Sequence, residues 1–440
     1  MKKRILLASL AAGLFLSIFS NGATAATEIQ WWHAMSGQLG ETVNHLVKGF
    51  NDSQSDYVLK AVHKGNYTET MTAAIAAFRA KQQPHIVQVF EVGTASMMAA
   101  KGAIYPVHEL MADAGEPFNE SSYLSAVIGY YTTTDGKLLS MPFNSSTPVL
   151  YWNKDAFKKA GLDRAPTTWQ EVGEYSKKLI ASGAAECGFT TGWQSWVQLE
   201  NFGTWHNTAF ASKENGFAGL DTEMQFNSPL HVRHIKQMAD WQKEKIFVYG
   251  GRRSTGNPMF VEGKCAMLTN SSASYGGIKQ SAKFAFGTSK LPYYEGVAGA
   301  PQNSIIGGAT LWVLKGGSKE EYKGVAKFMT YLSGIEAQTY WHKNTGYVPI
   351  TNAAYKMVKD SGYYSTPDGA DRDIAILQMS SKAPTGNSRG LRLGNFVQAR
   401  DIINEELEAI WAGKKTAQQG LDDAVSRSNA LLRKFERANK

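Results

Sequence analysis

The sequence has little cysteine and lacks the short motifs that mark common catalytic and nucleotide-binding sites. Its 440 residues include two cysteines, Cys187 and Cys265, which form neither a CxxC pair nor a cluster with histidines. A P-loop, a GxGxxG turn after a strand and an HExxH helix are absent as well. We therefore expect no cofactor, no metal site and no enzymatic activity. The two thiols could be bridged or unlinked, and the sequence leaves both possibilities open.

Charge is also sparse. Charged residues make up 19% of the chain, and the net charge of +8 is scattered, with its densest part in residues 427–440. A nucleic-acid-binding surface usually shows a basic stripe, so we expect no nucleic-acid partner. A hydrophobic content of 43% is typical of a globular protein, and the length is sufficient for two domains.

Long apolar runs are missing after the first 25 residues. At the N-terminus, Lys2, Lys3 and Arg4 precede an apolar run over residues 5–19, and small residues follow at 23–25. This pattern predicts a signal peptide over residues 1–25, cleaved after about Ala25. No cysteine follows the run, so we expect an exported, unanchored chain in a periplasm, without membrane insertion.

The rest of the chain alternates short apolar runs with amphipathic segments, which is typical of α/β domains. Strands are predicted at residues 29–32, 57–62, 86–90, 149–152 and 304–314, and helices near 39–50, 71–78, 155–160 and 320–332. A hairpin turn is expected at Asp135 and Gly136. The last hundred residues are expected to be largely helical. No Pro/Gly/Ser-rich linker separates two domains, so we expect the chain to cross between them more than once.

Short polar clusters occur next to the predicted strands. Residues 144–147 and 269–272 carry hydroxyl and amide side chains, and Gly307 and Gly308 leave backbone N–H groups unobstructed by a Cβ. We expect the first cluster just before a strand and the second between a strand and a helix. Hydroxyls and backbone N–H groups near helix N-termini bind anions, so these clusters are candidate anion ligands.

Several segments resemble the extracellular solute-binding proteins of ABC importers, family 1. The segments that carry the resemblance are residues 151–162 with 166–169, residues 260–267, and residues 411–416 with 421–424. Others are similar to the members of this family that bind sn-glycerol 3-phosphate, from about Trp32 to the C-terminus. These are residues 64–67, 88–94, 142–150, 305–312, 345–347 and 390–395.

The resemblance implies the two-lobe periplasmic-binding-protein fold, in which each lobe is a β-sheet flanked by helices and several chain crossings form the hinge. Lobe I would comprise residues 26–145 and 306–347, and lobe II residues 146–305 and 348–440. The implied function is capture of sn-glycerol 3-phosphate, and of glycerophosphodiesters as a further option, between the lobes. The implied partner is the membrane permease of the importer, and we expect a monomer.

The resemblance also implies a ligand site. The implied phosphate ligands are Tyr67, Ser146, Ser271, Gly308, Tyr347 and Arg400, whereas Glu91 and Trp169 would hold the glycerol end. An arginine fork matches phosphate oxygens, and Arg392 is a competing candidate for this role.

Two alternatives remain open. In an oligosaccharide-binding protein of the same fold, the many tryptophans would stack on sugar rings and Arg400 would be structural. In a secreted hydrolase, Glu91 would serve as acid or base.

Overall fold

The computed structural model describes residues 25–100, 102–133 and 135–440. The predicted signal peptide therefore lies almost entirely outside the described residues. The first strand begins at Thr27, two positions after the predicted cleavage site. Within the described residues, no helix has the length and apolar character that crossing a membrane requires.

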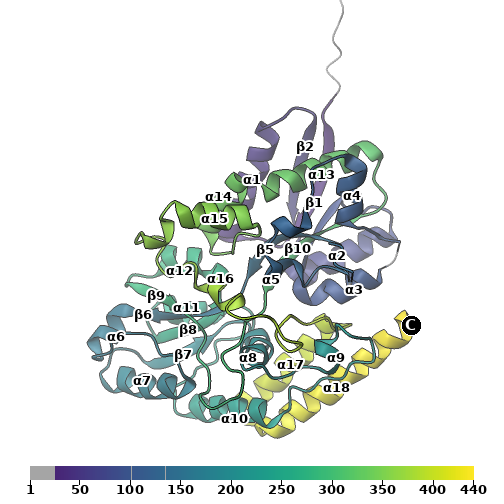
Figure 1. The fold of residues 1–440 in the computed structure, drawn as a ribbon. Helices are drawn as coiled ribbons and strands as arrows, with labels where there is room; N and C mark the ends of the chain where they lie inside the picture. The colour runs from purple at the N-terminus through teal and green to yellow at the C-terminus, as the bar shows by residue number, and fades with distance from the viewer. Residues whose placement is uncertain (1–24, 101, 134) are drawn as a thin grey trace, which may run out of the picture.

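The first of two β-sheets occupies the upper half of the molecule in Figure 1. Its strands run in the order β2-β1-β3-β10-β4, and β5 pairs with β10. Strands β1, β2 and β3 are parallel, whereas β10 runs antiparallel to β3. The strand bounds are β1 Thr27–His33, β2 Tyr57–His63, β3 Ile86–Phe90, β4 Ile104–Tyr105, β5 Met141–Ser146 and β10 Gly307–Leu314.

Amphipathic helices cover this sheet because their apolar faces need a partner. In α1, Val43, Leu46 and Phe50 recur at helical spacing and are buried. The helices of this half are α1 Gly37–Asp52, α2 Tyr67–Arg79, α3 Thr94–Ala99, α4 Val107–Ala114, α5 Ser125–Ile128, α13 Lys319–Ser333, α14 Ile335–Thr345 and α15 Asn352–Asp360.

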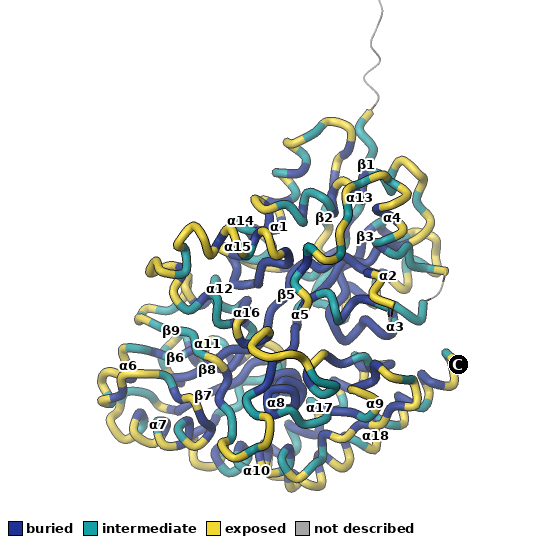
Figure 2. Tube along the Cα trace, in the orientation of Figure 1, coloured by how far each residue is buried: buried dark blue, intermediate teal, exposed yellow. Residues whose placement is uncertain are grey.

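The second sheet lies in the lower half, with strand order β7-β8-β6-β9. Its strands are β6 Pro148–Asn153, β7 Cys187–Thr191, β8 Cys265–Ser271 and β9 Phe286–Ser289. The surrounding helices are α6 Lys154–Lys159, α7 Trp169–Ala181, α8 Phe202–Trp205, α10 Pro229–Lys243, α11 Asn257–Val261, α12 Tyr275–Ser281, α16 Ile374–Met379, α17 Phe396–Trp411 and α18 Ala417–Asn439, with a short turn α9 at Ser212–Asn215. Figure 2 shows that the buried segments follow the strands and the junction between the two halves, whereas exposed segments form the periphery.

The chain crosses between the two halves three times. It passes from β5 to β6 through Thr147, and from β9 back to β10. The third crossing comes later than the boundary predicted at residue 347, because α15 packs on α14 and Thr351 bridges Tyr123 of the first half. The chain reaches the second half only at α16, which packs on β6.

Most predicted strands and helices are confirmed. The strand predicted from residue 304 begins at Gly307. The polar cluster at residues 144–147 precedes β6, as expected, and its first three residues also form the end of β5, whose backbone pairs with β10. At the predicted hairpin turn, Thr132 and Leu138 form an antiparallel bridge, and the N–H of Leu139 donates to the carbonyl oxygen of Tyr131 at 3.1 Å.

The cysteine question is resolved by the second sheet. Cys187 and Cys265 are partners in the parallel ladder of β7 and β8, and they form a disulfide with a Cα–Cα distance of 4.5 Å. The bond closes a loop with a sequence separation of 78 residues.

Replacing both cysteines by serine should lower the free energy of unfolding by about 4.5 kcal/mol, the chain-entropy value for a loop of this length. Urea unfolding of the oxidised protein, the reduced protein and the double variant measures this effect. The reduced protein and the variant should agree with each other. Equal midpoints for all three would contradict the expectation.

Several histidines are buried as neutral groups. Burial lowers the pKa of His206 to about 4 and that of His231 to about 3. His342 is also shifted by burial, to about 3, with Arg372 adding to the effect. The unfolded chain binds protons at these side chains near pH 6.5, whereas the folded chain does not.

Stability should therefore fall as the pH drops from about 7.5 to 5, by about 2 kcal/mol for each such histidine. Urea unfolding at several pH values measures the slope, which should become shallower in His231→Gln. The exposed His45 provides a control, and His45→Gln should leave the slope unchanged. An unchanged slope in His231→Gln would be the contrary result.

Candidate functional site

A cavity of about 420 Å³ lies between the two halves of the molecule. Seven of the eight predicted ligand residues line it, and they come from elements far apart in the sequence. Those of the first half are Tyr67, Glu91, Ser146, Gly308 and Tyr347; those of the second half are Ser271 and Arg400.

Two tyrosine hydroxyls meet at the side of the cavity formed by the first sheet. Asn144 donates from Nδ2 to the hydroxyl of Tyr67 at 2.8 Å, and Gln88 in turn donates to Oδ1 of Asn144 at 2.7 Å. Burial raises the pKa of Tyr67 well above its ordinary value, and its neighbour Tyr347 adds to the effect. Burial also raises the pKa of Tyr347. Both phenols therefore stay neutral and can donate hydrogen bonds to a ligand.

The floor of the cavity requires two consecutive glycines. Gly308 has a φ of +89°, and a Cβ at this position would lie 1.8 Å from the carbonyl oxygen of Asn144. A Cβ on Gly307 would lie 2.3 Å from Cζ2 of Trp196. Only glycine, which lacks a Cβ, therefore lets the backbone of β10 and the indole of Trp196 approach one another this closely.

A buried ionic triad lies at the junction of the two halves. Arg400 on α17 donates from Nη2 to Glu91 Oε1 at 2.6 Å. It also binds Glu200 with two hydrogen bonds, Nε to Oε1 at 2.9 Å and Nη2 to Oε2 at 2.6 Å. The side chains of Arg400, Glu91 and Glu200 are 7%, 5% and 1% exposed. Because Glu91 follows β3 and Arg400 belongs to α17, the triad joins the two halves.

The charges of the triad do not cancel. Burial disfavours the charge on Arg400, but the attraction of Glu200 and Glu91 outweighs it and raises the pKa of Arg400. Burial raises the pKa of Glu200, although Arg400 opposes that shift. In formal charge one guanidinium faces two carboxylates, and hydrogen bonds to both engage it, so Arg400 is not a free positive charge.

Trp169 is the predicted residue that the structure does not bring to the cavity. It begins α7 and is buried in the second half, with its ring 4.6 Å from that of His234 and 6.0 Å from that of Phe189. Its indole is one of the apolar side chains that attach α7 to the sheet. The prediction that Trp169 contacts the ligand is therefore corrected.

Sequence patterns did not identify several residues of the cavity and the triad. Trp193, Trp196 and Arg253 line the cavity, and Glu200 lies behind Arg400. Trp196 and Glu200 belong to the π-helical turn η3, Trp196–Asn201. Nε1 of Trp196 is buried and has no hydrogen-bond partner within the described part of the chain. The tryptophan-rich composition of residues 193–205 was the available signal.

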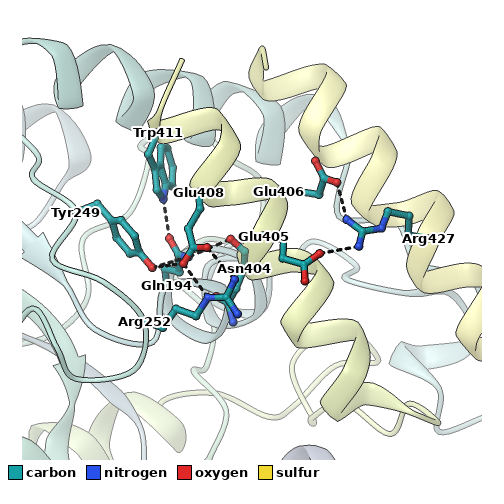
Figure 3. Close-up of polar contacts among 9 residues, drawn as sticks. All are labelled: Gln194, Tyr249, Arg252, Asn404, Glu405, Glu406, Glu408, Trp411 and Arg427. Carbon is teal, nitrogen blue, oxygen red and sulfur yellow. Dashed lines mark hydrogen bonds and ion pairs between the residues drawn. The ribbon is translucent and has the colours of Figure 1, made fainter. Parts of the chain in front are cut away.

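Figure 3 shows how α17 holds the loops that border the cavity. Arg252 donates to both carboxylate oxygens of Glu408, each at 2.7 Å, and Tyr249 donates to Oε1 of Glu408 at 2.8 Å. Trp411 donates to Gln194 Oε1 at 2.6 Å, and Gln194 donates to the hydroxyl of Tyr249 at 3.1 Å.

The same figure shows how α17 is fixed on its other face. Arg427 of α18 pairs with Glu405 at 2.6 Å and with Glu406 at 2.7 Å. The helix that carries Arg400 is therefore held from two sides.

Among the described residues, no three His, Cys, Asp or Glu side chains are grouped as ligands for a metal ion. The arrangement provides hydrogen-bond donors, two aromatic walls and a carboxylate in a confined space. This chemistry suits recognition of a small polar molecule.

Comparisons with known proteins agree with this geometry. The family model of the bacterial extracellular solute-binding proteins matches residues 45–366. The chain is 52% identical to the sn-glycerol-3-phosphate-binding periplasmic protein UgpB of Salmonella typhimurium, over 98% of each chain. It is 51% identical to the protein of the same name from Yersinia pseudotuberculosis, over 96% of each.

Solved structures share the fold. UgpB of Mycobacterium tuberculosis in complex with glycerophosphocholine superposes with a TM-score of 0.78 at 21% identity, covering 93% of this chain and 99% of that one. Maltose-bound MalE3 of T. maritima gives 0.75 at 18% identity, covering 92% and 100%. The predicted two-lobe fold is thereby confirmed, and the chain belongs to the bacterial extracellular solute-binding protein family.

Proposed function

We propose that this protein is the periplasmic substrate-binding component of an ABC importer and that it captures sn-glycerol 3-phosphate between its two lobes. The observation that carries the proposal is the cavity, into which both lobes direct hydrogen-bond donors. The 52% identity to UgpB of Salmonella typhimurium over nearly the whole chain supports the choice of ligand.

Each cavity residue has a role in this proposal. Phosphate oxygens accept hydrogen bonds from the backbone N–H of Gly308 and from the hydroxyls of Tyr67, Ser146, Ser271 and Tyr347. These hydrogen bonds are strong because the acceptor is charged. Glu91 accepts hydrogen bonds from the glycerol hydroxyls. Trp193 and Trp196 replace Trp169 as the aromatic walls around the carbon chain.

The mechanism is closure of two lobes around the ligand. Lobe I comprises about residues 26–145 and 306–347, extended to about 360 by the packing of α15 on α14, and lobe II comprises the remainder. A ligand that contacts both lobes stabilises the closed arrangement. The closed monomer then docks on the membrane permease and releases its cargo. Residues 1–25 direct export and are then removed by cleavage after Ala25.

Glycerophosphodiesters are a second candidate ligand. The M. tuberculosis protein of this fold was solved with glycerophosphocholine, and the cavity of about 420 Å³ is within the range of ordinary small-molecule sites. We propose binding without hydrolysis, because Glu91 is already engaged by Arg400. Incubation with glycerophosphocholine should release no choline, and product formation would contradict this part of the proposal.

Isothermal titration calorimetry with sn-glycerol 3-phosphate and with maltose tests the ligand class. We expect micromolar affinity for sn-glycerol 3-phosphate, about −8 kcal/mol, and no heat with maltose. Heat with maltose alone would favour the oligosaccharide alternative, in which Trp193 and Trp196 stack on sugar rings.

Gly308→Ala tests the floor of the cavity. The added methyl group would collide with Asn144, so we expect a lower melting temperature and a loss of affinity for sn-glycerol 3-phosphate of at least about tenfold. The control is Gly296→Ala, because Gly296 also has a positive φ, +78°, but no atom lies within 4 Å of its Cβ position. This control should lose about 1 kcal/mol of stability and no affinity. Equal affinities of both variants would contradict the proposed role of Gly308.

A further inference from the structure

Two arginines line the cavity, and their surroundings differ. Arg400 is buried and bound to two carboxylates. Arg253 is exposed at the mouth of the cavity, and its guanidinium has no ion-pair partner among residues 25–100, 102–133 and 135–440. Its sequence neighbour Arg252 differs again, because Glu408 binds it through two hydrogen bonds.

The backbone at Arg253 is held in an uncommon conformation. Arg253 has a φ of +56° and Trp193 a φ of +46°, which lie in the left-handed region that side chains other than glycine rarely adopt. The N–H of Trp193 donates to the carbonyl oxygen of Arg253 at 2.7 Å. Two adjoining left-handed residues, both lining the cavity, indicate that the surrounding structure imposes their positions, as is common at ligand sites.

The contacts in Figure 3 explain how these positions are imposed. Arg252, the sequence neighbour of Arg253, binds Glu408 of α17. Gln194, the sequence neighbour of Trp193, binds Trp411 of α17 and also Tyr249, which itself binds α17. The segments on either side of the cavity mouth are therefore fixed to the helix that carries Arg400. Arg253 projects from a fixed backbone, although its guanidinium has no ion pair of its own.

The charge balance determines which arginine can receive an anion. Without Arg253, the cavity and its immediate surroundings hold Arg400, Glu91 and Glu200, with a formal net charge of −1. A phosphate monoester carries about −1.5 to −2 charges at pH 7, so a triad of this formal charge does not attract it. Arg253 brings the total to zero and is the remaining cation of the cavity lining in the described chain.

We infer that Arg253 supplies the positive charge that binds the phosphate and selects phosphate monoesters, whereas Arg400 orients Glu91 toward the hydroxyl end of the ligand. This inference rests on the proposed function. The side chain of Arg253 is exposed, and only the backbone of this residue is fixed. The guanidinium can therefore turn onto the ligand without breaking an existing ion pair.

The test compares wild type, Arg253→Gln, Arg253→Lys and Arg437→Gln. Arg437 is exposed on α18, so its replacement changes the net charge equally without touching the cavity. Calorimetry at pH 7.5 measures the Kd of sn-glycerol 3-phosphate, a dianion, and of its methyl ester, a monoanion. Melting temperatures show that each variant is folded.

For sn-glycerol 3-phosphate, Arg253→Gln should raise the Kd by ~10-fold or more, as expected for the loss of a charge-assisted contact. The methyl ester should lose markedly less, Arg253→Lys should recover part of the affinity, and Arg437→Gln should match wild type. The affinity of wild type should also rise between pH 5 and pH 7.5 as the phosphate loses its second proton, and this rise should be smaller in Arg253→Gln.

The contrary outcomes can be told apart. If wild type binds sn-glycerol 3-phosphate and Arg253→Gln binds it equally well, the inference is wrong and the proposed function stands. Equal losses for the two esters, or the same loss in Arg437→Gln, would also overturn the inference. If wild type binds neither ester, the proposed function fails and the inference with it.

Discussion

The buried triad of Arg400, Glu91 and Glu200 is the interaction on which the rest of the site depends. Ionised side chains removed from water are strongly destabilising unless they are paired and hydrogen-bonded. Here three of them are almost fully buried in one cluster, so each fixes the position of the other two. Because Glu91 comes from the first lobe and Arg400 from the second, the cluster also determines where the lobes meet. The cavity is built around this meeting point.

The other components of the site follow from the same contact. Helix α17 carries Arg400, and it also holds Arg252 and Gln194, and through them the loops that carry Arg253 and Trp193. Across the cavity, the glycine pair of β10 lets Trp196 approach the strand, and the chain of Gln88, Asn144 and Tyr67 orients a phenol toward the ligand. Several groups of the cavity lining are thus held by neighbouring side chains, which is the arrangement that precise recognition requires.

Local structure could be predicted from the sequence, whereas the closest contacts could not. Strands such as Ile86–Phe90 and the helix Lys319–Ser333 follow from hydrophobic periodicity, which depends only on neighbouring residues. Family motifs placed seven ligand candidates around one cavity. Trp169 was misassigned because a family motif identifies a local stretch of sequence, and this does not tell which of many tryptophans faces the cavity and which faces the core. Glu200 was missed because its partner Arg400 is 200 positions away in the chain, and Arg253 because its importance depends on the carboxylates that surround the other arginine.

Strand order in the first sheet has a consequence for how the chain folds. β10 lies between β3 and β4, yet Gly307 follows Phe90 by 217 positions. Until that late strand pairs, one edge of β3 is open and the sheet is incomplete. Pairings so distant in sequence form slowly. The glycine pair that borders the cavity belongs to β10, so this side of the cavity takes its shape only when the slow pairing is complete.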